Sequence, residues 1–594
     1  MTTRLRVNLK TLFLFPVIIA LFLAVACGSS ATSTPLPTST PVPPTAVPPT
    51  VAPTAAPQAT EAPAPAAPAA SAAVPDIAAA VIDTDRSRVP EGELTIGVHV
   101  NISPRWMNPQ IMTAGLMSYE LAWKVHDNMF KPMQGNPFTY ALADFYNMTD
   151  DFMQATIRLR EGVKFHNGDL ITSEDVAFSY ENYHGANAAL FEEFTESVDI
   201  IDERTIQINF KKPFLDFFLN YATPASAAGV IIPKDYYLSL GDNDEDRDEA
   251  FSNAPIGAGP FKFVRQEAGI FVEFEAFTDY WRKVPHVKTL ISRGIRDVAV
   301  RAASLKSGEV DFIYFVTGDV LESIIDDPDL DVDPNNSGPF WLMFPDQNDP
   351  DSPFNDVRVR QAVSLAIDRQ FLSDRETQGL AIPTGNFIPP SWPGVVQRPV
   401  DPFDLAKAKD LMAEAGYGDG FSIDWFTPFP AVESMSLRVM EQLREIGIES
   451  EMQLMERPVY QEKLREGFTD AANTDHKGFP GRQIVMAISV TPGNAATYIN
   501  IWGRCGGTSS LICNDRIDAL WDGYQASSDL GEREDLIRDA QSILLDEFMF
   551  VPIYINAFAV GMGPRVAGKP SDYTAVAMNV LLGPNEDLRL KSNP

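Results

Sequence analysis

A histidine in a tight turn is the first residue whose type could do chemistry. His166 opens the turn His166-Asn167-Gly168-Asp169, where an imidazole could serve as a general base or a metal ligand. Neither a nucleophile nor a paired histidine stands beside it, and both kinds of chemistry need such a partner. We therefore predict a structural role for His166, in which its ring hydrogen-bonds the backbone of the turn.

Two other stretches approach known sites and fall short of them. The acidic run 241–246 has the oxygen ligands that calcium prefers, but it lacks the glycine and the distal glutamate of an EF-hand loop, so we expect a solvated loop. The run 563–569 resembles a phosphate-binding loop, yet Pro570 follows where that loop needs Ser or Thr. The chain also contains no His-Glu-x-x-His and no Gly-x-Ser-x-Gly. The sequence therefore predicts no catalytic residue, no metal site and no cofactor, and so no enzyme.

The elements around His166 form one strand, turn and helix unit over 156–180. Ile157 and Leu159 alternate with arginines, which is the period of a half-buried strand. Thr172 is placed to cap the helix that follows, with Asp175 as the reciprocal acid of a capping box.

Strand and helix patterns alternate again in the second half of the chain. The sequence predicts a strand over 422–426, a helix over 432–446 and a strand over 448–454. A β-α-β unit implies parallel strands joined by a right-handed crossover. The second half is therefore predicted to be α/β.

Charge excludes one class of partner. The 594 residues include 47 basic and 80 acidic side chains, for a formal net charge of −33. Such a charge repels nucleic acid at long range. Because nearly half of the residues are apolar, the chain can build the cores of several domains, and we expect it to bind no nucleic acid.

The N-terminus, residues 1–27, reads as an export signal with a lipid attachment site. A basic start precedes the apolar run 11–26, which is shorter than the roughly 20 residues of a membrane-spanning helix. The end of the signal, 23–30, resembles a bacterial lipobox, although Ala24 stands where a leucine or similar residue is usual. We expect lipidation at Cys27, and an ordinary signal peptide is the alternative.

Residues 28–90 form a predicted tether. Thirteen prolines lie among Thr, Ala, Val and Ser over 31–80, and no aromatic residue occurs between Gly28 and Pro90. This composition cannot bury enough surface to fold, and it favours extended polyproline II. Such a tether would hold a folded receptor away from a membrane surface while leaving it free to reorient.

The unit at 156–180 resembles a family signature. Its run 159–168, followed by an acidic helix start, is similar to the signature of the family 5 extracellular solute-binding proteins, which serve ABC importers of oligopeptides, dipeptides and nickel. Further blocks that resemble this family follow in order at 254–261, 308–311, 353–369 and 403–417.

The resemblance implies an α/β fold of the type II periplasmic-binding-protein (Venus flytrap) kind, in which two lobes close around a solute. The implied parts are a first lobe of residues 91–338 and 553–594, an inserted subdomain of the first lobe at about 118–240, and a second lobe of 339–552. The chain should cross between the lobes near 332–344 and return near 551–558.

The resemblance also implies a ligand cleft between the lobes. In that family an asparagine-proline segment lies close to the cleft, and the residues after the Gly-Glu-Val-Asp block line it. With aromatic and neutral residues of the second lobe, the predicted ligand contacts are Trp106, Met107, Asn108, Tyr314, Phe315, Trp392, Trp425, Asn494, Tyr498, Trp502 and Arg504. This lining suits extended ligands held by stacking and backbone hydrogen bonds.

The segment before Cys505 is informative by what it lacks. Peptide-binding members of the family commonly carry an aspartate here for the ammonium group of the ligand, but residues 486–504 contain no Asp, Glu or His. Nickel chelation therefore has no support, and a bound α-amine would need its counter-charge from elsewhere. Cys505 and Cys513 lie close in sequence, and in an exported chain we expect them to form a disulfide.

These features predict an extracytoplasmic, lipid-anchored and monomeric substrate-binding protein of an ABC importer. It would capture a peptide or a similar extended solute and deliver it to a permease that is driven by ATPase subunits. A surface receptor of the same fold without transport, and an oligosaccharide binder, stay open as alternatives. A surface-anchored hydrolase would need paired carboxylates or a nucleophile with its base, and the sequence shows neither constellation.

Overall fold

The protein is described here by a computed structural model. It describes residues 77–592 except 113–115, 134–135, 223–226, 335–339, 348, 350, 389, 391–393, 428–432, 456–458, 461–462, 464–482, 490–493, 506, 508–509, 558 and 573–583. The predicted signal, the lipidation site and most of the predicted tether lie outside the described residues.

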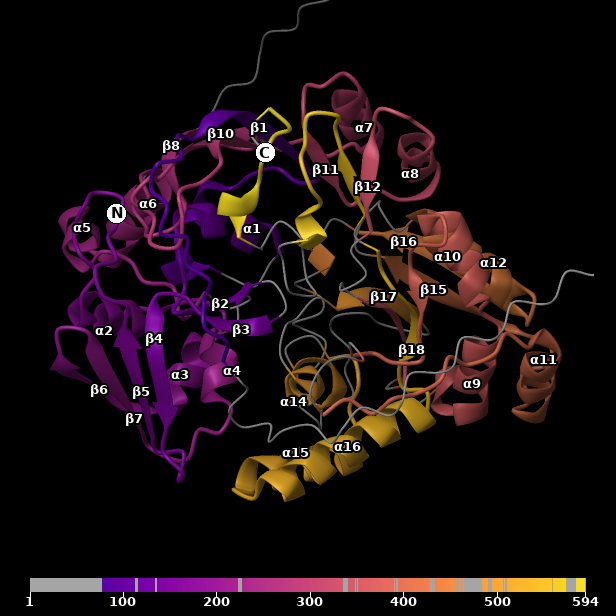
Figure 1. Ribbon diagram of the computed structural model, residues 1–594. Coiled ribbons are helices and arrows are strands. Elements are labelled where there is room, and N and C mark those ends of the chain that lie inside the picture. The colour runs from indigo at the N-terminus through magenta and orange to yellow at the C-terminus, as the bar shows by residue number, and fades with distance from the viewer. Residues whose placement is uncertain are drawn as a thin grey trace, which may run out of the picture. The chain divides into compact units, whose positions relative to one another are not determined.

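The first lobe is built on a sheet of mixed strand direction. Its described strands lie in the order β12-β19-β11-β1-β10-β9-β8 (Figure 1). They are β1 (Glu91–Val98), β8 (Phe261–Glu267), β9 (Phe271–Ala276), β10 (Val287–Gly294), β11 (Phe312–Tyr314), β12 (Asp331–Asp333) and β19 (Val560–Met562). Strand β1 pairs in parallel with β10 on one side and β11 on the other. Residues Leu94 to Val98 of β1 are all buried, as expected for a central parallel strand covered on both faces.

Helices α1 (Leu116–Val125), α7 (Val298–Lys306) and α8 (Gly318–Ile325) pack against strands of this sheet. Helices α5 (Lys234–Ser239) and α6 (Asp244–Asn253) contact each other. Helix α7 packs beside β11 and α8 beside β12 (Figure 1). As the sequence indicated, Gly308 follows α7 with a φ of +74°, a left-handed conformation that favours glycine after a helix.

The predicted inserted subdomain, at about 118–240, contains between residues 130 and 222 an antiparallel sheet in the order β4-β5-β7-β6 and a hairpin of β2 and β3. Its elements are β2 (Phe130–Met133), β3 (Asn136–Tyr140), β4 (Ala143–Met148), β5 (Gln154–Leu159), α2 (Ser173–Glu181), α3 (Ala188–Phe194), β6 (Thr195–Asp202), β7 (Thr205–Phe210) and α4 (Phe217–Ala222). Burial alternates along β5 and β7, so one face of this sheet lies on a core. The predicted capping box is present, since the Thr172 backbone N–H donates to Asp175 Oδ2 at 2.9 Å.

The second lobe has its own sheet, with described strands in the order β14-β18-β13-β17-β15-β16. They are β13 (Phe340–Pro345), β14 (Ile382–Pro383), β15 (Phe421–Thr427), β16 (Ile448–Leu454), β17 (Gln483–Ser489) and β18 (Val551–Ile555). Its helices are α9 (Val357–Leu365), α10 (Arg369–Thr377), α11 (Leu405–Glu414), α12 (Glu433–Arg444), α14 (Ala495–Tyr498), α15 (Asp515–Ala526) and α16 (Leu530–Asp546). The predicted β-α-β unit is confirmed, because β15 and β16 pair in parallel with α12 between them.

The chain passes twice between the two sheets. It leaves the first sheet after β12 and enters the second at β13, and it returns between β18 and β19. Tyr554 and Ile555 still pair with β14 in the second sheet. A boundary between residues 552 and 553 would therefore cut β18, and the return crossing lies after Ile555.

Buried charges hold the C-terminal segment on the first lobe. The carboxylate of Glu586 is fully buried, pairs with Arg282 and lies 3.9 Å from Lys131 Nζ. Burial alone would raise the pKa of Glu586, but Arg282 and Lys131 lower it to about 2. A charged carboxylate is therefore part of the folded interior.

The acidic run 241–246 is only partly a loop, because its second half, 244–246, is the first turn of helix α6. Asn243 Oδ1 accepts a hydrogen bond from the Asp246 N–H at 3.1 Å, and α6 begins at Asp244. The expectation of a solvated loop was wrong for this half of the run, because an Asn cap and acids in the first turn stabilise a helix N-terminus.

Candidate ligand-binding site

An aromatic cluster lies at the carboxyl edge of the first sheet. His99 follows β1 and Phe315 follows β11, and these strands run parallel, so both residues leave the sheet at the same edge. The His99 ring stacks on Phe315 with centroids 5.0 Å apart and meets Tyr314 edge-on at 5.1 Å. Ligands of α/β sheets bind at this edge. Two predicted contacts, Tyr314 and Phe315, are thus brought together there with His99, which the sequence reasoning missed.

Phe315 has an unusual backbone. Its φ is +61°, a left-handed value that bulky residues rarely adopt. Its carbonyl oxygen accepts a hydrogen bond from Arg301 Nη2 at 3.1 Å. Residues with strained backbone that their surroundings hold in place cluster at functional sites. The left-handed conformation of Phe315 also sets the direction in which the chain leaves β11.

The predicted contacts at 106–108 are divided between two environments. Trp106 is half-buried and packs against the main hydrophobic core, whereas Met107 is fully buried. Asn108 is also fully buried: its Oδ1 accepts from the Gln110 N–H at 3.0 Å and its Nδ2 donates to Asp248 Oδ1 at 2.8 Å. The fold employs the amide of Asn108 to shape a turn, and ligand contact stays a prediction for these three residues.

Trp425 lies near the carboxyl end of β15 in the second sheet. Its side chain is fully buried, and within the described part of the chain its indole Nε1–H has no hydrogen-bond acceptor. Strand β15 pairs in parallel with both β16 and β17, so this edge of the second sheet is also the carboxyl edge of parallel strands. A buried donor without a partner is destabilising unless a ligand or water satisfies it.

The segment 494–504 carries four predicted contacts on one irregular helix. Asn494 caps α14, since its Oδ1 accepts from the Thr497 N–H at 3.0 Å, and α14 continues as a π-helix over Ile499–Gly503. Tyr498 and Trp502 are both buried. Short π-helical turns inside α-helices are frequent at functional sites.

Trp502 has the same unpaired donor as Trp425. Its ring stacks on Phe344 with centroids 5.7 Å apart, and it is 6% exposed. Among the described residues no acceptor reaches its Nε1. Two buried indole donors of the second lobe therefore have no acceptor among the described residues.

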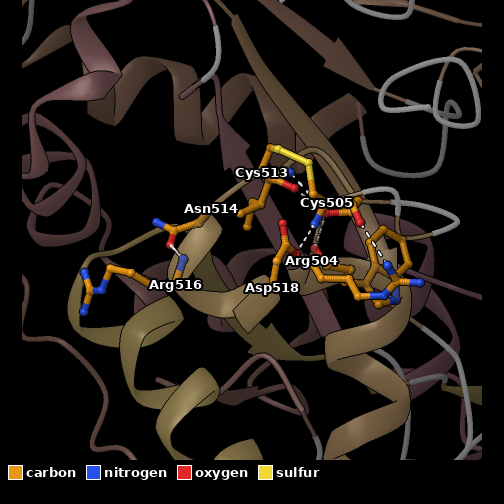
Figure 2. Close-up of a disulfide and its surroundings, with 9 residues drawn as sticks. Arg504, Cys505, Cys513, Asn514, Arg516 and Asp518 are labelled. Atoms are coloured by element: carbon orange, nitrogen blue, oxygen red, sulfur yellow. Dashed lines mark hydrogen bonds between the residues drawn. A yellow bond between two sulfur atoms is a disulfide. The ribbon is translucent and has the colours of Figure 1, made fainter. Parts of the chain in front are cut away.

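Arg504 and the cysteines close this segment (Figure 2). Cys505 and Cys513 form a disulfide, and the Cys505 N–H donates to Asp518 Oδ1 of α15 at 3.0 Å. The Arg504 guanidinium lies 5.4 Å from the centre of the Trp521 ring, and its Nε donates to Asn500 Oδ1 at 2.7 Å. Burial lowers the pKa of Arg504, although it stays a cation. The π-helix is thereby joined to α15.

One group of metal-ligand types lies at the same place. Cys505, Cys513 and Asp518 offer ligand atoms within 4.8 Å of one another. Both sulfur atoms are already bonded to each other, and metal binding by cysteine requires thiolates. The geometry is that of a disulfide and its hydrogen-bonded neighbour.

Two small cavities lie between the inserted subdomain and the second lobe. Their volumes are about 40 and 70 Å³. Asn494 lines the first, Thr497 and Asn500 line the second, and Asp216 lines both. A larger hollow of about 700 Å³ lies elsewhere, beside Arg160, and is lined by none of the predicted contacts. Trp392, the remaining predicted contact, lies outside the described residues.

No helix among the described residues combines the length and hydrophobicity of a membrane span.

The chain is 25% identical to heme-binding protein A of Haemophilus influenzae over 497 residues, which cover 78% of this chain and 88% of that protein. It is 26% identical to di/tripeptide-binding protein 1 of Pseudomonas aeruginosa over 486 residues, 76% of this chain and 87% of that protein.

A solved structure shows the same fold. The periplasmic binding protein DppA of Helicobacter pylori, in complex with the peptide STSA, matches with a TM-score of 0.68 at 22% identity, over 84% of this chain and 98% of that one. The fold is therefore the two-lobed type II fold of periplasmic binding proteins.

The family model described as "Bacterial extracellular solute-binding proteins, family 5 Middle" matches residues 138–493, which contain most of the inserted subdomain and much of the second lobe. Proteins of this family bind their solutes and are not enzymes. The chain belongs to the bacterial extracellular solute-binding proteins of family 5.

Proposed function

We propose that this protein is the lipid-anchored substrate-binding component of an ABC importer, and that it holds a peptide or a similarly extended solute between its lobes. Its relatives include proteins named for binding heme and di- and tripeptides, and its fold is that of a protein solved with a bound peptide. The closed form would present the solute to a permease.

The observation that carries the proposal is the pair of unsatisfied indole donors beside aromatic surfaces. Trp425 and Trp502 each bury an Nε1–H that has no acceptor in the part of the chain that the structure describes. His99 lies against Tyr314 and Phe315 on the other lobe. Peptide carbonyl oxygens would accept from the indoles while aromatic faces hold the side chains. Oligosaccharide hydroxyls could accept in the same way, so this class is the second candidate.

Native mass spectrometry of the freshly purified full-length protein tests the proposal. We expect a co-purified solute of one chemical class at up to one molecule per chain. Thermal shift with Ser-Thr-Ser-Ala, dipeptides, glutathione, heme and cello-oligosaccharides as probes then separates the classes. A protein that carries no solute and is stabilised by none of these probes would contradict the proposal.

A second experiment tests how an amine would be bound. Because residues 486–504 contain no acidic side chain, we expect N-acetylation of a bound peptide to weaken binding less than tenfold. Isothermal titration with the free and the acetylated peptide measures this. A larger loss, with the amine placed against 486–504 in a crystal structure, would overturn the idea.

The anchor and the transport role need tests of their own. Metabolic labelling with a fatty acid should mark the wild-type chain and not the Cys27→Ser variant. Solute-loaded protein should stimulate ATP hydrolysis by a permease and ATPase encoded beside it. Solute binding without such stimulation would favour the alternative, a surface receptor of the same fold that takes no part in transport.

A further inference from the structure

Three residues join the inserted subdomain to the second lobe. Asp216 lies in the turn before α4, Tyr524 on α15 and Arg533 on α16. The Tyr524 hydroxyl lies 2.7 Å from Asp216 Oδ1 and 2.9 Å from Oδ2, and Arg533 Nη2 donates to Oδ2 at 3.0 Å. One carboxylate of the first lobe thus accepts from two donors of the second.

The second lobe builds its half of this contact by itself. The Arg533 guanidinium lies 3.6 Å from the centre of the Tyr524 ring, and its Nη1 donates to the Tyr524 carbonyl oxygen at 2.5 Å. Both side chains are 5% exposed. Neither has to reorganise to receive the carboxylate, so little conformational entropy is lost when the contact forms.

The first lobe offers a more accessible partner. The Asp216 side chain is 27% exposed, so water can solvate it when the contact opens. Arg533 also keeps its two contacts to Tyr524 in that case. The contact can therefore break without leaving a charge fully buried and unpaired, which a core ion pair could not do.

The surroundings of the contact are loosely packed. The cavities of about 40 and 70 Å³ both have Asp216 and Arg533 in their walls. Phe214 and Asn220 of the subdomain face Thr497 and Asn500 across the larger one. Protein interiors are closely packed and have few such voids. Interfaces between parts of a chain that move relative to one another are more polar than interiors.

We propose that Asp216, Tyr524 and Arg533 form a latch that holds the two lobes together and can open. The latch adds a solute-independent contribution to closure. It also fixes α15 and α16 against the subdomain, and with them the segment 494–504 that the disulfide joins to α15. The inference rests on the proposed closing motion but not on the identity of the solute.

Distance measurements between spin labels test the latch in the full-length, ligand-free chain. Labels at Glu196→Cys on β6 and Asp535→Cys on α16 occupy exposed positions, and a Cys27→Ser background leaves only the disulfide-bonded native cysteines. We expect a short-distance population in the parent that Asp216→Ala reduces by about tenfold or more, because a charge-assisted contact is lost. Tyr524→Phe keeps the ring under Arg533 and should reduce that population less.

A matched control removes a carboxylate elsewhere in the subdomain. Glu193→Gln breaks an exposed ion pair with Lys212 and should leave the distances unchanged. Circular dichroism confirms that each variant is folded. The latch is refuted if the parent shows no short-distance population, or if Asp216→Ala and Tyr524→Phe leave that population as it is. Since no solute is added, this outcome is independent of whether a transported solute is found.

Discussion

His166 Nε2 lies 2.9 Å from the carbonyl oxygen of Gly259, 93 residues further along the chain. The Gly257 N–H lies 3.4 Å from the other ring nitrogen, so the neutral ring can donate at Nε2 and accept at Nδ1. The predicted structural role of His166 is confirmed, but the backbone that its ring binds belongs to the turn at 254–261 and not to its own turn. The two glycines of that turn let it approach Val125 and His126 closely.

Replacing His166 should therefore reduce stability. His166→Ala removes both ring contacts and leaves a cavity, and we expect a loss of about 2–3 kcal/mol in the free energy of unfolding. Urea unfolding followed by tryptophan fluorescence measures it. His184→Ala, at an exposed side chain, is the matched control and should change stability by less than about 0.5 kcal/mol. Equal effects of the two substitutions would contradict the role.

Gly257→Ala tests the close approach directly. A Cβ at this position would lie 2.2 Å from the Val125 carbonyl oxygen, which is backbone and cannot turn aside. We expect destabilisation of about 1–3 kcal/mol or more from overpacking. Gly269→Ala is the comparison variant. Its Cβ would lie in open space at a φ of +81°, so its loss of stability measures backbone strain without overpacking. A Gly257→Ala protein as stable as the parent would disprove the packing argument.

One buried and one half-buried histidine should make the fold sensitive to mild acid. Burial lowers the pKa of His126 to about 4 and that of His166 to about 3. The unfolded chain takes up these protons near pH 6.5 and the folded chain does not, so stability is full above pH 6.5 and falls as the pH is lowered toward 4. Each histidine should contribute a loss of about 2 kcal/mol between pH 7 and pH 5.

Urea midpoints at pH 7 and pH 5 measure this dependence. The decrease should be smaller in His166→Gln, which retains hydrogen-bonding groups but does not titrate, and unchanged in His184→Gln. Identical midpoints at the two pH values in the parent would rule out the mechanism.

Glu586 should be required for the folded C-terminal segment. Glu586→Gln leaves Arg282 and Lys131 without their buried carboxylate, and we expect a loss of about 3 kcal/mol or more. Because the pKa of Glu586 is lowered to about 2, its stabilising contribution is present above pH 4.5 and is lost as the pH falls from 4.5 toward 2. Thermal unfolding compares this variant with Glu193→Gln, where an exposed pair is broken and little change is expected. A Glu586→Gln protein that unfolds at the parent temperature would argue against the buried network.

Removing the disulfide should loosen the predicted ligand segment. The bond joins cysteines eight residues apart, and closing a loop of that size stabilises a fold by about 2.5 kcal/mol in the chain-entropy model. The double variant Cys505→Ala, Cys513→Ala should lose about this much in calorimetry, and reductant should then have no further effect. Cys27→Ser is the control and should unfold like the parent. A double variant that keeps the stability of the parent would contradict the prediction.

The unpaired indoles should affect binding more than folding. Trp425→Phe and Trp502→Phe each delete a buried donor for which the described residues offer no acceptor, so stability should change by less than about 1.5 kcal/mol. The amount of co-purified solute, released by denaturation and measured by mass spectrometry, should fall. Trp281→Phe is the opposite control, because its Nε1 donates to Asp127 Oδ2 at 2.6 Å and its loss should lower stability without releasing solute. Unchanged solute in both indole variants would remove this support for the site.

Much of this protein could be predicted from local patterns. The strand over 154–159, the helix capped by Thr172 and the β-α-β unit of β15, α12 and β16 follow from periods and caps that act over a few residues. The family could be recognised for the same reason, since its signature is a string of such units. These features depend on the chemistry of neighbours along the chain.

Tertiary packing decided the rest. Asn108 donates its amide hydrogen to Asp248, 140 residues away, a contact that no local pattern indicates, and its predicted ligand contact stays a prediction. His99 joined Tyr314 and Phe315 through parallel pairing of β1 and β11, and the latch brings together Asp216 and Tyr524 across 308 residues. No local period reports such contacts, since they form only where separate cores place distant side chains within hydrogen-bonding reach. The sequence therefore determined the elements and the family, and the packing of those elements determined which residues can meet a ligand or each other.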